Sequence, residues 1–194
     1  MNSRWAWGVL MMGGVALIVL GVVLRTTWRQ PSTGVRAPFA CPADAKKANL
    51  NFTLADVDGK PVRLSDLAGK VVLVDFWATW CQPCKVEIPG FINLYSKYRS
   101  RGLEVVGIVV MDDFPNVKPF VDRMKMNYTI VDGIDRADVE AAFGPLVGLP
   151  TSFLISRDGR VCAAHEGIPT PLPPGSSIEQ SIQRVFESEI LALL

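Results

Sequence analysis

Apolar and polar positions along the chain divide it into an anchor, a tether and a domain. The twenty residues from Trp5 to Leu24 carry no charge, and an apolar helix of that length spans the hydrocarbon core of a bilayer. A cleaved signal peptide has a shorter apolar core followed by a small-residue cleavage site, and no such site follows Leu24. The pattern favours an uncleaved membrane anchor over residues 1–29, with cleavage as the alternative.

The segment that follows the anchor, 30–47, contains three prolines, a glycine and several small residues. Such a composition is typical of a tether. Residues 48–194 then change to alternating strand-like and helix-like patterns, which predict one further domain. Within it, alternating apolar positions on both sides of a turn at Asp58 and Gly59 predict a hairpin over 49–64.

The central part of the domain contains two continuous apolar runs, at 71–76 and 103–111, which are typical of strands buried on both faces. The other predicted helices are a single turn over 65–69 and longer segments from Cys81 to about residue 101, over 117–126 and over 139–143. The remaining predicted segments are an extended piece at 128–131, a hairpin of 151–155 with 160–165 and a proline-rich spacer over 169–175. A last helix would be capped by Ser176 or Ser177, with Ile178, Ile182, Val185 and Ile190 on one face. This order predicts an α/β fold with a mixed central sheet.

Composition narrows the function classes. The 194 residues include 20 basic and 19 acidic side chains, for a formal net charge of +1. No basic stripe is present, so nucleic acid is not an expected partner. Four cysteines are too few for a disulfide scaffold in a chain of this length. They suffice for one catalytic pair and either a further pair or two spare thiols.

Two of these cysteines, Cys81 and Cys84, stand two residues apart where an apolar strand runs into a predicted helix. A thiolate at a helix N-terminus is stabilised by unsatisfied N–H groups and the positive end of the macrodipole, and Pro83 suits the first turn. We expect Cys81 to be the exposed attacking thiol and Cys84 the more buried resolving thiol. A structural disulfide or half of a zinc site is the alternative, but no second pair has zinc-ligand spacing, so neither metal nor cofactor is expected.

The residues around this motif carry a resemblance. The string from Asp75 to Lys85 resembles the active-site segment of the thioredoxin superfamily, and 87–89 together with 148–155 resembles its TlpA/ResA-like members, in the AhpC/TSA and Redoxin-like branch. The resemblance covers roughly residues 49–166. It implies a thioredoxin fold with an added N-terminal hairpin and a helical insertion, and a membrane-anchored, extracytoplasmic thiol-disulfide oxidoreductase.

Two carboxyl groups are candidates for a role in thiol chemistry. Asp75 lies at an inward position of an apolar strand, where burial should raise its pKa and let it take the proton of Cys84; the resemblance gives it the same role. Glu87 follows Cys84 by three residues and should share its helix face, and the resemblance implies that it tunes the thiols. The alternatives are a hydrogen-bonded buried aspartate and a solvated glutamate without catalytic parts.

The resemblance also implies a target-binding rim. Pro150 would be cis and lie against the cysteine pair, and the backbone of Leu149 would pair with an extended target segment. Trp80 and Pro83 would flank the site, whereas Trp77 is expected in the core.

Cys41 and Cys162 remain, and they either pair as a structural disulfide or stay free. His165, the single histidine, has no neighbouring motif and is expected at the surface.

The predicted function is an anchored, monomeric disulfide reductase. The resemblance suggests apocytochrome c or a copper chaperone as the target and a membrane-embedded thiol protein as electron donor, although Gln82 departs from the ResA-like pattern and leaves the target open. A disulfide-forming oxidant of the DsbA type would use the same cysteines in reverse. A non-catalytic peptide-binding module is a further alternative.

The expected location is the outer side of the cytoplasmic membrane, with a single span. The positive-inside rule alone would argue the reverse, because Arg25, Arg29 and Arg36 follow the span and only Arg4 precedes it among charged side chains. The bias is small, and the resemblance favours an extracytoplasmic domain.

Overall fold

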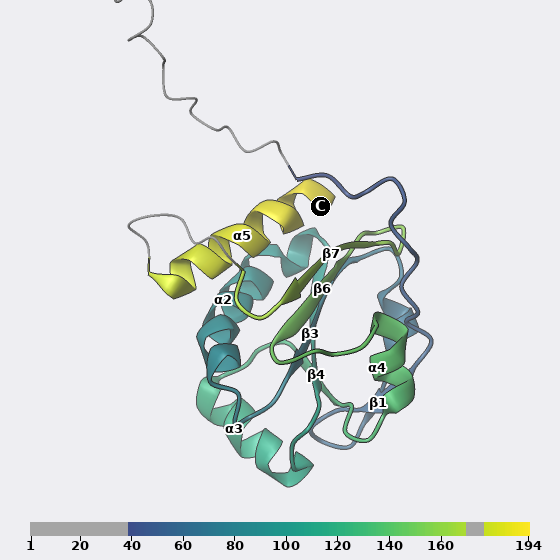
Figure 1. The fold of residues 1–194 in the computed structure, drawn as a ribbon. Coiled ribbons are helices and arrows are strands. Elements are labelled where there is room, and N and C mark those ends of the chain that lie inside the picture. The colour runs from purple at the N-terminus through teal and green to yellow at the C-terminus, as the bar shows by residue number, and fades with distance from the viewer. Residues whose placement is uncertain (1–38, 170–176) are drawn as a thin grey trace, which may run out of the picture. The chain divides into compact units, whose positions relative to one another are not determined.

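A five-stranded sheet lies at the centre of the computed structural model, which describes residues 39–169 and 177–194 (Figure 1). The strands are β3 Val71–Trp77, β4 Leu103–Val109, β5 Thr129–Asp132, β6 Thr151–Ile155 and β7 Val161–Glu166, in the order β5-β4-β3-β6-β7. β3, β4 and β5 run parallel, and β6 and β7 run antiparallel to their neighbours. The sheet is therefore mixed, as the order of elements predicts.

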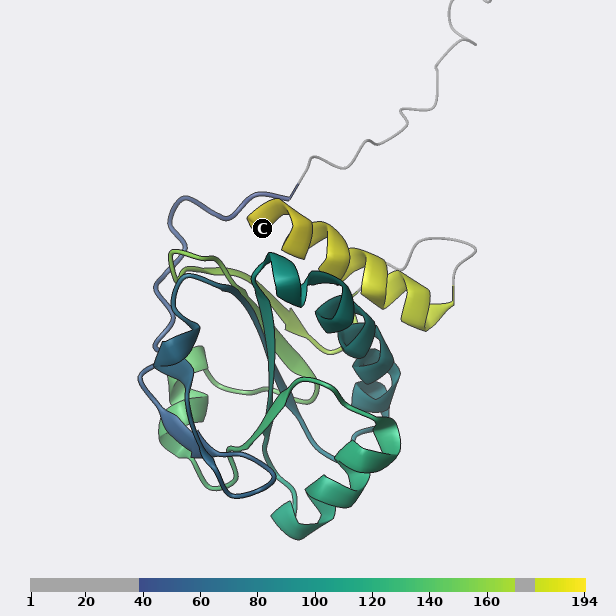
Figure 2. The ribbon, with the colours of Figure 1, turned by 180° about the vertical axis from the view of Figure 1, so that it is seen from behind.

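The helices form layers on the two faces of this sheet. One face is covered by α2 Gln82–Tyr98, α3 Val117–Met124 and α5 Ile178–Leu193, and the other by α4 Ala137–Phe143 and the hairpin of β1 Thr53–Ala55 and β2 Pro61–Arg63 (Figures 1 and 2). Three short 3₁₀ turns complete the fold, at Leu64–Leu67, Arg99–Arg101 and Phe114–Asn116. This is the thioredoxin-like arrangement, with helices on both faces and an added hairpin.

Some predicted segments lie outside the described residues: the membrane anchor over 1–29, the tether up to residue 38, and the proline spacer from residue 170. Within residues 39–169 and 177–194, no helix is long and apolar enough to cross a membrane.

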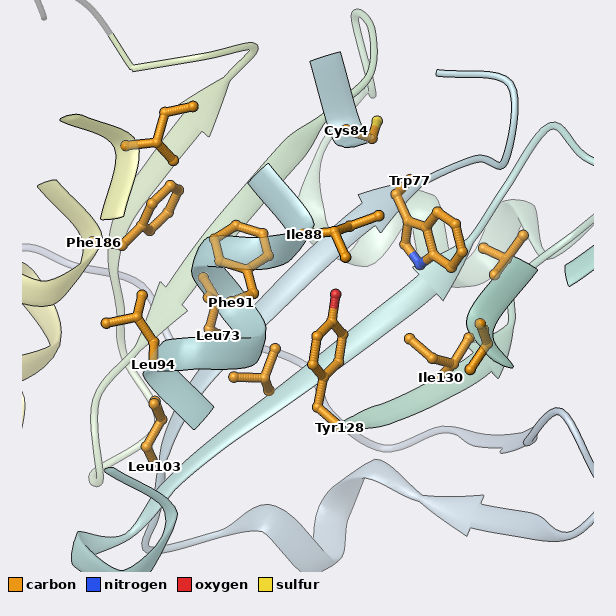
Figure 3. Close-up of a cluster of buried hydrophobic side chains, with 14 of the residues drawn as sticks. Leu73, Trp77, Cys84, Ile88, Phe91, Leu94, Leu103, Tyr128, Ile130 and Phe186 are labelled. Carbon is orange, nitrogen blue, oxygen red and sulfur yellow. The ribbon is translucent and has the colours of Figure 1, made fainter. Parts of the chain in front are cut away.

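Strand β3 explains how the two apolar layers are separated. All seven of its residues are buried, and successive side chains point to opposite faces. Leu73 and Trp77 enter the cluster beneath α2, α3 and α5, shown in Figure 3, whereas Val72, Val74 and Phe76 enter the cluster beneath α4 and the hairpin. A strand covered on both faces reads as a continuous apolar run.

Gly107 makes room in the first of these layers. It pairs with Asp75 on β3 and with Ile130 on β5. A Cβ atom here would lie 2.7 Å from Trp77 Nε1 and 2.7 Å from Ile130 Cδ1. Glycine therefore lets the Trp77 indole lie over β4.

The last helix agrees with the prediction at Ile182 and Ile190, which are buried, and differs from it at its first residue. Ser177 does cap α5, and its Oγ accepts the Gln180 N–H at 3.2 Å. Ile178, expected on the buried face, is 47% exposed because it occupies the first helical position, beyond the sheet. Phe186 takes the central place and meets Phe91 of α2 edge to face at 5.0 Å between ring centroids.

His165 also differs from the prediction, because α5 covers the strand that carries it. Its Nε2 lies 2.8 Å from a carboxylate oxygen of Glu189, and its ring meets Phe186 at 4.9 Å. The side chain of His165 is 17% exposed. The single histidine is thus a packing residue between β7 and α5 rather than a surface residue.

Candidate active site at the start of helix α2

The two motif cysteines form a disulfide at the N-terminus of α2. Cys81 is the N-cap residue, and its Sγ accepts the backbone N–H of Cys84 at 3.2 Å. Pro83 lies in the first turn, where its missing N–H costs no hydrogen bond. When the bond is reduced, the same N–H and the positive end of the helix favour a thiolate on Cys81. The local backbone thus supplies what a nucleophilic thiol needs.

Both cysteines are buried in this oxidised form. Cys81 is 2% exposed and Cys84 is 1% exposed, so the expected contrast between an exposed and a buried thiol is not seen. The disulfide itself is one physical reason, because each sulfur covers the other. Only a small part of the Cys81 surface is therefore accessible at the helix start.

The rim of this site is partly apolar and exposed. Trp80 is 57% exposed, and its Nε1 donates a hydrogen bond to the Met111 carbonyl oxygen at 2.7 Å. The Thr79 N–H donates to the Asp112 carboxylate. These two bonds tie the loop before Cys81 to the segment after β4. Met111 is itself 53% exposed, so it adds a second large apolar side chain to the rim.

The predicted proline segment reaches the same end of the sheet. The Leu149–Pro150 peptide bond is cis, and Thr151 pairs with Phe76 near the end of β3. The Thr151 hydroxyl donates to the Gly148 carbonyl oxygen at 2.7 Å, which fixes the turn. Leu149 and Pro150 therefore come at the sheet end from which β3 continues toward Cys81.

Two acidic side chains lie in the layer between α2 and the sheet. Asp75 and Glu87 are each 1% exposed, and the Ser152 hydroxyl donates to Asp75 Oδ1 at 3.3 Å. Burial raises the pKa of Asp75 to about 7, although the Ser152 hydrogen bond opposes the shift. Burial, and then repulsion from Asp75, raises the pKa of Glu87 to about 9. Groups with such pKa values can exchange protons near neutral pH.

No sequence motif points to Tyr128 as a neighbour of these acidic side chains. This tyrosine lies just before β5, is 7% exposed, and its hydroxyl makes no hydrogen bond to another protein group. Because Ile130 is in register with Gly107, and Gly107 with Asp75, the residue two positions before Ile130 faces the same layer. The alternation from Ile130 is a usable signal, but only once the strand register is known.

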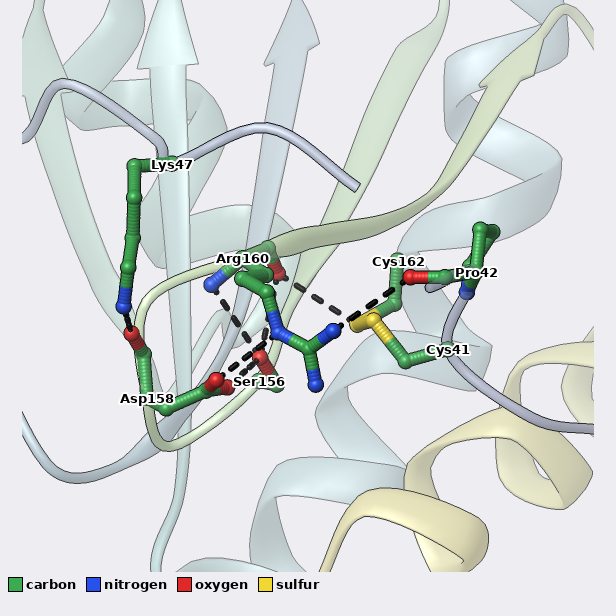
Figure 4. The surroundings of a disulfide bond; sticks show 7 residues. All are labelled: Cys41, Pro42, Lys47, Ser156, Asp158, Arg160 and Cys162. Atoms are coloured by element: carbon green, nitrogen blue, oxygen red, sulfur yellow. Dashed lines mark hydrogen bonds and ion pairs between the residues drawn. A yellow bond between two sulfur atoms is a disulfide. The ribbon is translucent and has the colours of Figure 1, made fainter. Parts of the chain in front are cut away.

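The second disulfide, Cys41–Cys162, lies elsewhere (Figure 4). It joins residues 121 positions apart, with 4.6 Å between their Cα atoms. Arg160 donates to the Pro42 carbonyl oxygen at 3.3 Å, and residue 47 forms a β-bridge with Arg160. Residues 41–47 of the expected tether are thus held against the start of β7. Neither cysteine caps a helix of the described chain.

Comparison with known proteins agrees with this geometry. Residues 45–164, more than half of the chain, match the model of the AhpC/TSA family. The chain belongs to the AhpC/TSA family. Within it, the sequence groups with the ResA-like thiol-disulfide oxidoreductases. Thiol-disulfide oxidoreductase ResA of Geobacillus thermodenitrificans is 42% identical over 147 residues, which cover 75% of this chain and 78% of that protein.

Other relatives are consistent with this placement. ResA of Bacillus subtilis is 39% identical over 120 residues, so the chain matches 66% of that protein's length and 62% of its own. Among solved structures, a thiol:disulfide interchange protein of the thioredoxin family from Chlorobium tepidum is similar with a TM-score of 0.63 and 32% identity. The match covers 78% of this chain and all of the other.

Proposed function

We propose that this protein is a membrane-anchored protein-disulfide reductase that acts outside the cytoplasm. The observation that carries the proposal is the hydrogen bond from the Cys84 N–H to Cys81 Sγ at the N-terminus of α2. It supports Cys81 as the attacking sulfur, because a hydrogen bond to Sγ would stabilise negative charge there. The relatives named ResA support the class of reaction.

The reaction follows from the two sulfurs. In the reduced protein, the Cys81 thiolate attacks a target disulfide, one target sulfur leaves as a thiolate and takes up a proton, and a mixed disulfide remains. Cys84 gives up its proton and attacks Cys81 Sγ, which expels the second target thiolate. Two electrons pass from the cysteine pair to the target, and the Cys81–Cys84 disulfide is restored. A membrane-embedded thiol protein would reduce it again.

The surrounding residues receive roles from their positions. We assign Asp75 as the base that takes the proton of Cys84, and Glu87 as the group that adjusts the charge beside it, because both are buried with raised pKa values. Trp80 and Pro83 would contact the target from the helix side. The backbone of Leu149, before Pro150, would pair with an extended target segment.

The rim favours a target of particular chemistry. Met111 and three acidic residues, Asp112, Asp135 and Glu140, are among those that line a surface hollow of about 560 Å³. With the exposed Trp80 nearby, this surface suits an extended segment with apolar and cationic residues. Apocytochrome c and a copper chaperone remain the candidate targets, and the membrane anchor over 1–29 would hold a monomeric enzyme near them.

The trapping experiment uses the Cys84→Ser variant of the full chain in cells. Without the resolving thiol, the mixed disulfide on Cys81 persists, so we expect adducts that disappear under reductant and contain specific extracytoplasmic proteins. A Cys81→Ser, Cys84→Ser double variant is the control and should trap nothing. Absence of any adduct at Cys81 would contradict the proposal.

The reduction potential of the Cys81–Cys84 pair tests the direction of electron flow. A reductase should have a potential near that of thioredoxin, on the order of −270 mV, whereas a disulfide-forming oxidant lies near −120 mV. Equilibration with glutathione or dithiothreitol buffers, followed by thiol counting, distinguishes these cases. A value near the oxidant would favour the alternative of a DsbA-like enzyme.

A further inference from the structure

The buried acidic pair has a third polar neighbour, Tyr128. Asp75 Oδ2, both carboxylate oxygens of Glu87 and the Tyr128 hydroxyl are buried and make no hydrogen bond to another protein group. In Figure 3 the Tyr128 hydroxyl points from the sheet toward α2, into the space beside Ile88 and Trp77. Buried polar groups nearly always find a partner, either directly or through an ordered water.

The three groups act on one another electrostatically. Burial, then the charges of Asp75 and Glu87, raise the pKa of Tyr128 well above its usual range. The phenol therefore keeps its proton at every physiological pH and stays a hydrogen-bond donor.

The groups that face this cluster come from four elements. β3 contributes Asp75, α2 contributes Glu87 and Cys84, β6 contributes Ser152, and the segment before β5 contributes Tyr128. The neighbouring residues of α3 in this layer, Val117, Phe120 and Val121, are apolar. Three buried donors of this layer keep their own proton: the hydroxyls of Ser152 and Tyr128 and the indole N–H of Trp77. Ser152 already donates to Asp75, whereas the Tyr128 and Trp77 donors have no protein partner.

We propose that Tyr128 is a positioning residue for the resolving step, and that its hydroxyl donates to the ionised carboxylate of the Asp75–Glu87 pair through one water. The inference rests on the proposed function and refines its second step. The proton passes from the Cys84 thiol to the carboxylate, the bond from Cys84 to Cys81 Sγ forms, and the bond from Cys81 to the target breaks with its electron pair on the target. Donation by Tyr128 keeps the carboxylate ionised, and therefore basic, at neutral pH.

Removing the hydroxyl should make the base harder to ionise. A hydrogen bond to a charged buried group accounts for roughly one unit of pKa or more. In Tyr128→Phe we expect the pH midpoint of resolution to rise by about one unit, and resolution below that midpoint to slow about tenfold. Attack by Cys81 does not use this proton and should be unchanged.

The test uses the reduced full chain and dithionitrobenzoate as the disulfide probe. Attack by Cys81 releases one thionitrobenzoate, and resolution by Cys84 releases a second, so stopped-flow absorbance separates the two phases. Tyr98→Phe is the matched control, because Tyr98 is also a buried residue but its hydroxyl donates to Glu187 at 2.5 Å. Both variants should give a thermal unfolding transition, which shows that each of them is folded.

The outcomes separate the two proposals. A second phase shifted to higher pH only in Tyr128→Phe supports the inference. An unshifted second phase, or equal effects on both phases or in Tyr98→Phe, overturns it while leaving the proposed function intact. A wild-type chain without a second phase overturns the proposed function itself.

A second measurement covers the case in which Tyr128→Phe does not fold. The ultraviolet difference spectrum of the wild-type tyrosines should change as Asp75 and Glu87 ionise, and this change should be lost in Asp75→Asn together with Glu87→Gln. A spectrum that does not respond to carboxylate ionisation would overturn the inference.

Discussion

The two disulfides of this protein are made of the same atoms in different surroundings. Cys81–Cys84 joins residues three apart at the N-terminus of a helix, where the Cys84 N–H points at Cys81 Sγ. Cys41–Cys162 joins residues 121 apart, and neither sulfur meets a helix start. The redox chemistry of each disulfide therefore depends on the backbone around its cysteines rather than on the S–S bond itself. One pair sits where a thiolate is stabilised, and the other attaches a segment to the sheet.

The same comparison has an energetic side. In the chain-entropy view, a cross-link stabilises the fold more when it closes a longer loop of the unfolded chain. The Cys41–Cys162 loop is far longer than that of Cys81–Cys84. The Cys41–Cys162 disulfide should therefore contribute more to stability, while only the Cys81–Cys84 pair should contribute to turnover.

The largest expected effect is on activity. Cys81→Ser should lower the rate of disulfide reduction on the order of 10³-fold or more, because no other group replaces the nucleophile. Cys162→Ser should change that rate less than about threefold, since its sulfur lies outside the site. Steady-state reduction of insulin by the full chain measures both rates. Comparable losses in the two variants would show that the two disulfides do not differ in their roles.

The next effect is on stability. Replacing both Cys41 and Cys162 by Ser should lower the free energy of unfolding by about 2–4 kcal/mol. Guanidinium unfolding of the chain, with Cys81–Cys84 kept oxidised, measures the change. A loss below about 1 kcal/mol would show that the segment before β1 is held by its other contacts instead.

The third prediction concerns the effect of pH on stability through Asp75, the buried aspartate of β3. The pKa of Asp75 is raised from an ordinary value of 3.8 to about 7. Between pH 3.8 and about pH 7, the folded state therefore keeps a proton on Asp75 that the unfolded state loses. The stability of the folded state falls as the pH rises through this range. Asp75→Asn should therefore be more stable than wild type by about 1–3 kcal/mol at pH 8, with the difference gone below about pH 4.

The control for this prediction is Asp158, which lies near the Cys41–Cys162 disulfide (Figure 4). The pKa of Asp158 is lowered, first by the Ser156 hydrogen bond, and its carboxylate is exposed. Asp158→Asn should gain no stability at high pH. Thermal unfolding across pH, with both disulfides intact, compares the two, and a pH-independent effect of Asp75→Asn would contradict the assigned burial cost.

The smallest effect belongs to Arg160. It donates to the Pro42 carbonyl oxygen and pairs with Asp158 at 2.7 Å, but it is partly exposed. Arg160→Ala should lower the free energy of unfolding by about 0.5–1 kcal/mol and leave activity unchanged. A larger loss, measured in the same unfolding assay, would mean that side-chain contacts hold the segment as strongly as the disulfide.

Local signals predicted most of the fold. β6 runs from Thr151 to Ile155 as expected, because Pro150 precedes it and a turn at Arg157–Gly159 follows it. The start of α2 at Cys81 was also predictable, since N-cap, proline and cysteine spacing are all local. α3 ends two residues earlier than predicted because Lys125 adopts a left-handed backbone with φ 55°.

Features that depend on contacts between distant elements could not be predicted. The place of Phe186 depends on how it meets Phe91 of α2, and His165 is largely covered because Glu189 and Phe186 of α5 lie against it. The partner of Cys41 lies 121 residues away, so spacing left pairing and non-pairing equally open. The register of β4 with β5 turns Tyr128 toward the layer that contains Asp75, and no local pattern shows this.

The most direct test of the central claim is selective reduction of the oxidised full chain. The protein is incubated in thiol buffers of increasingly negative potential, alkylated, and digested, and mass spectrometry counts the free form of each cysteine. We predict that Cys81 and Cys84 become alkylated over a range in which Cys41 and Cys162 stay bonded, and that Cys81 reacts first at neutral pH. Simultaneous opening of both disulfides, or earlier opening of Cys41–Cys162, would contradict the account.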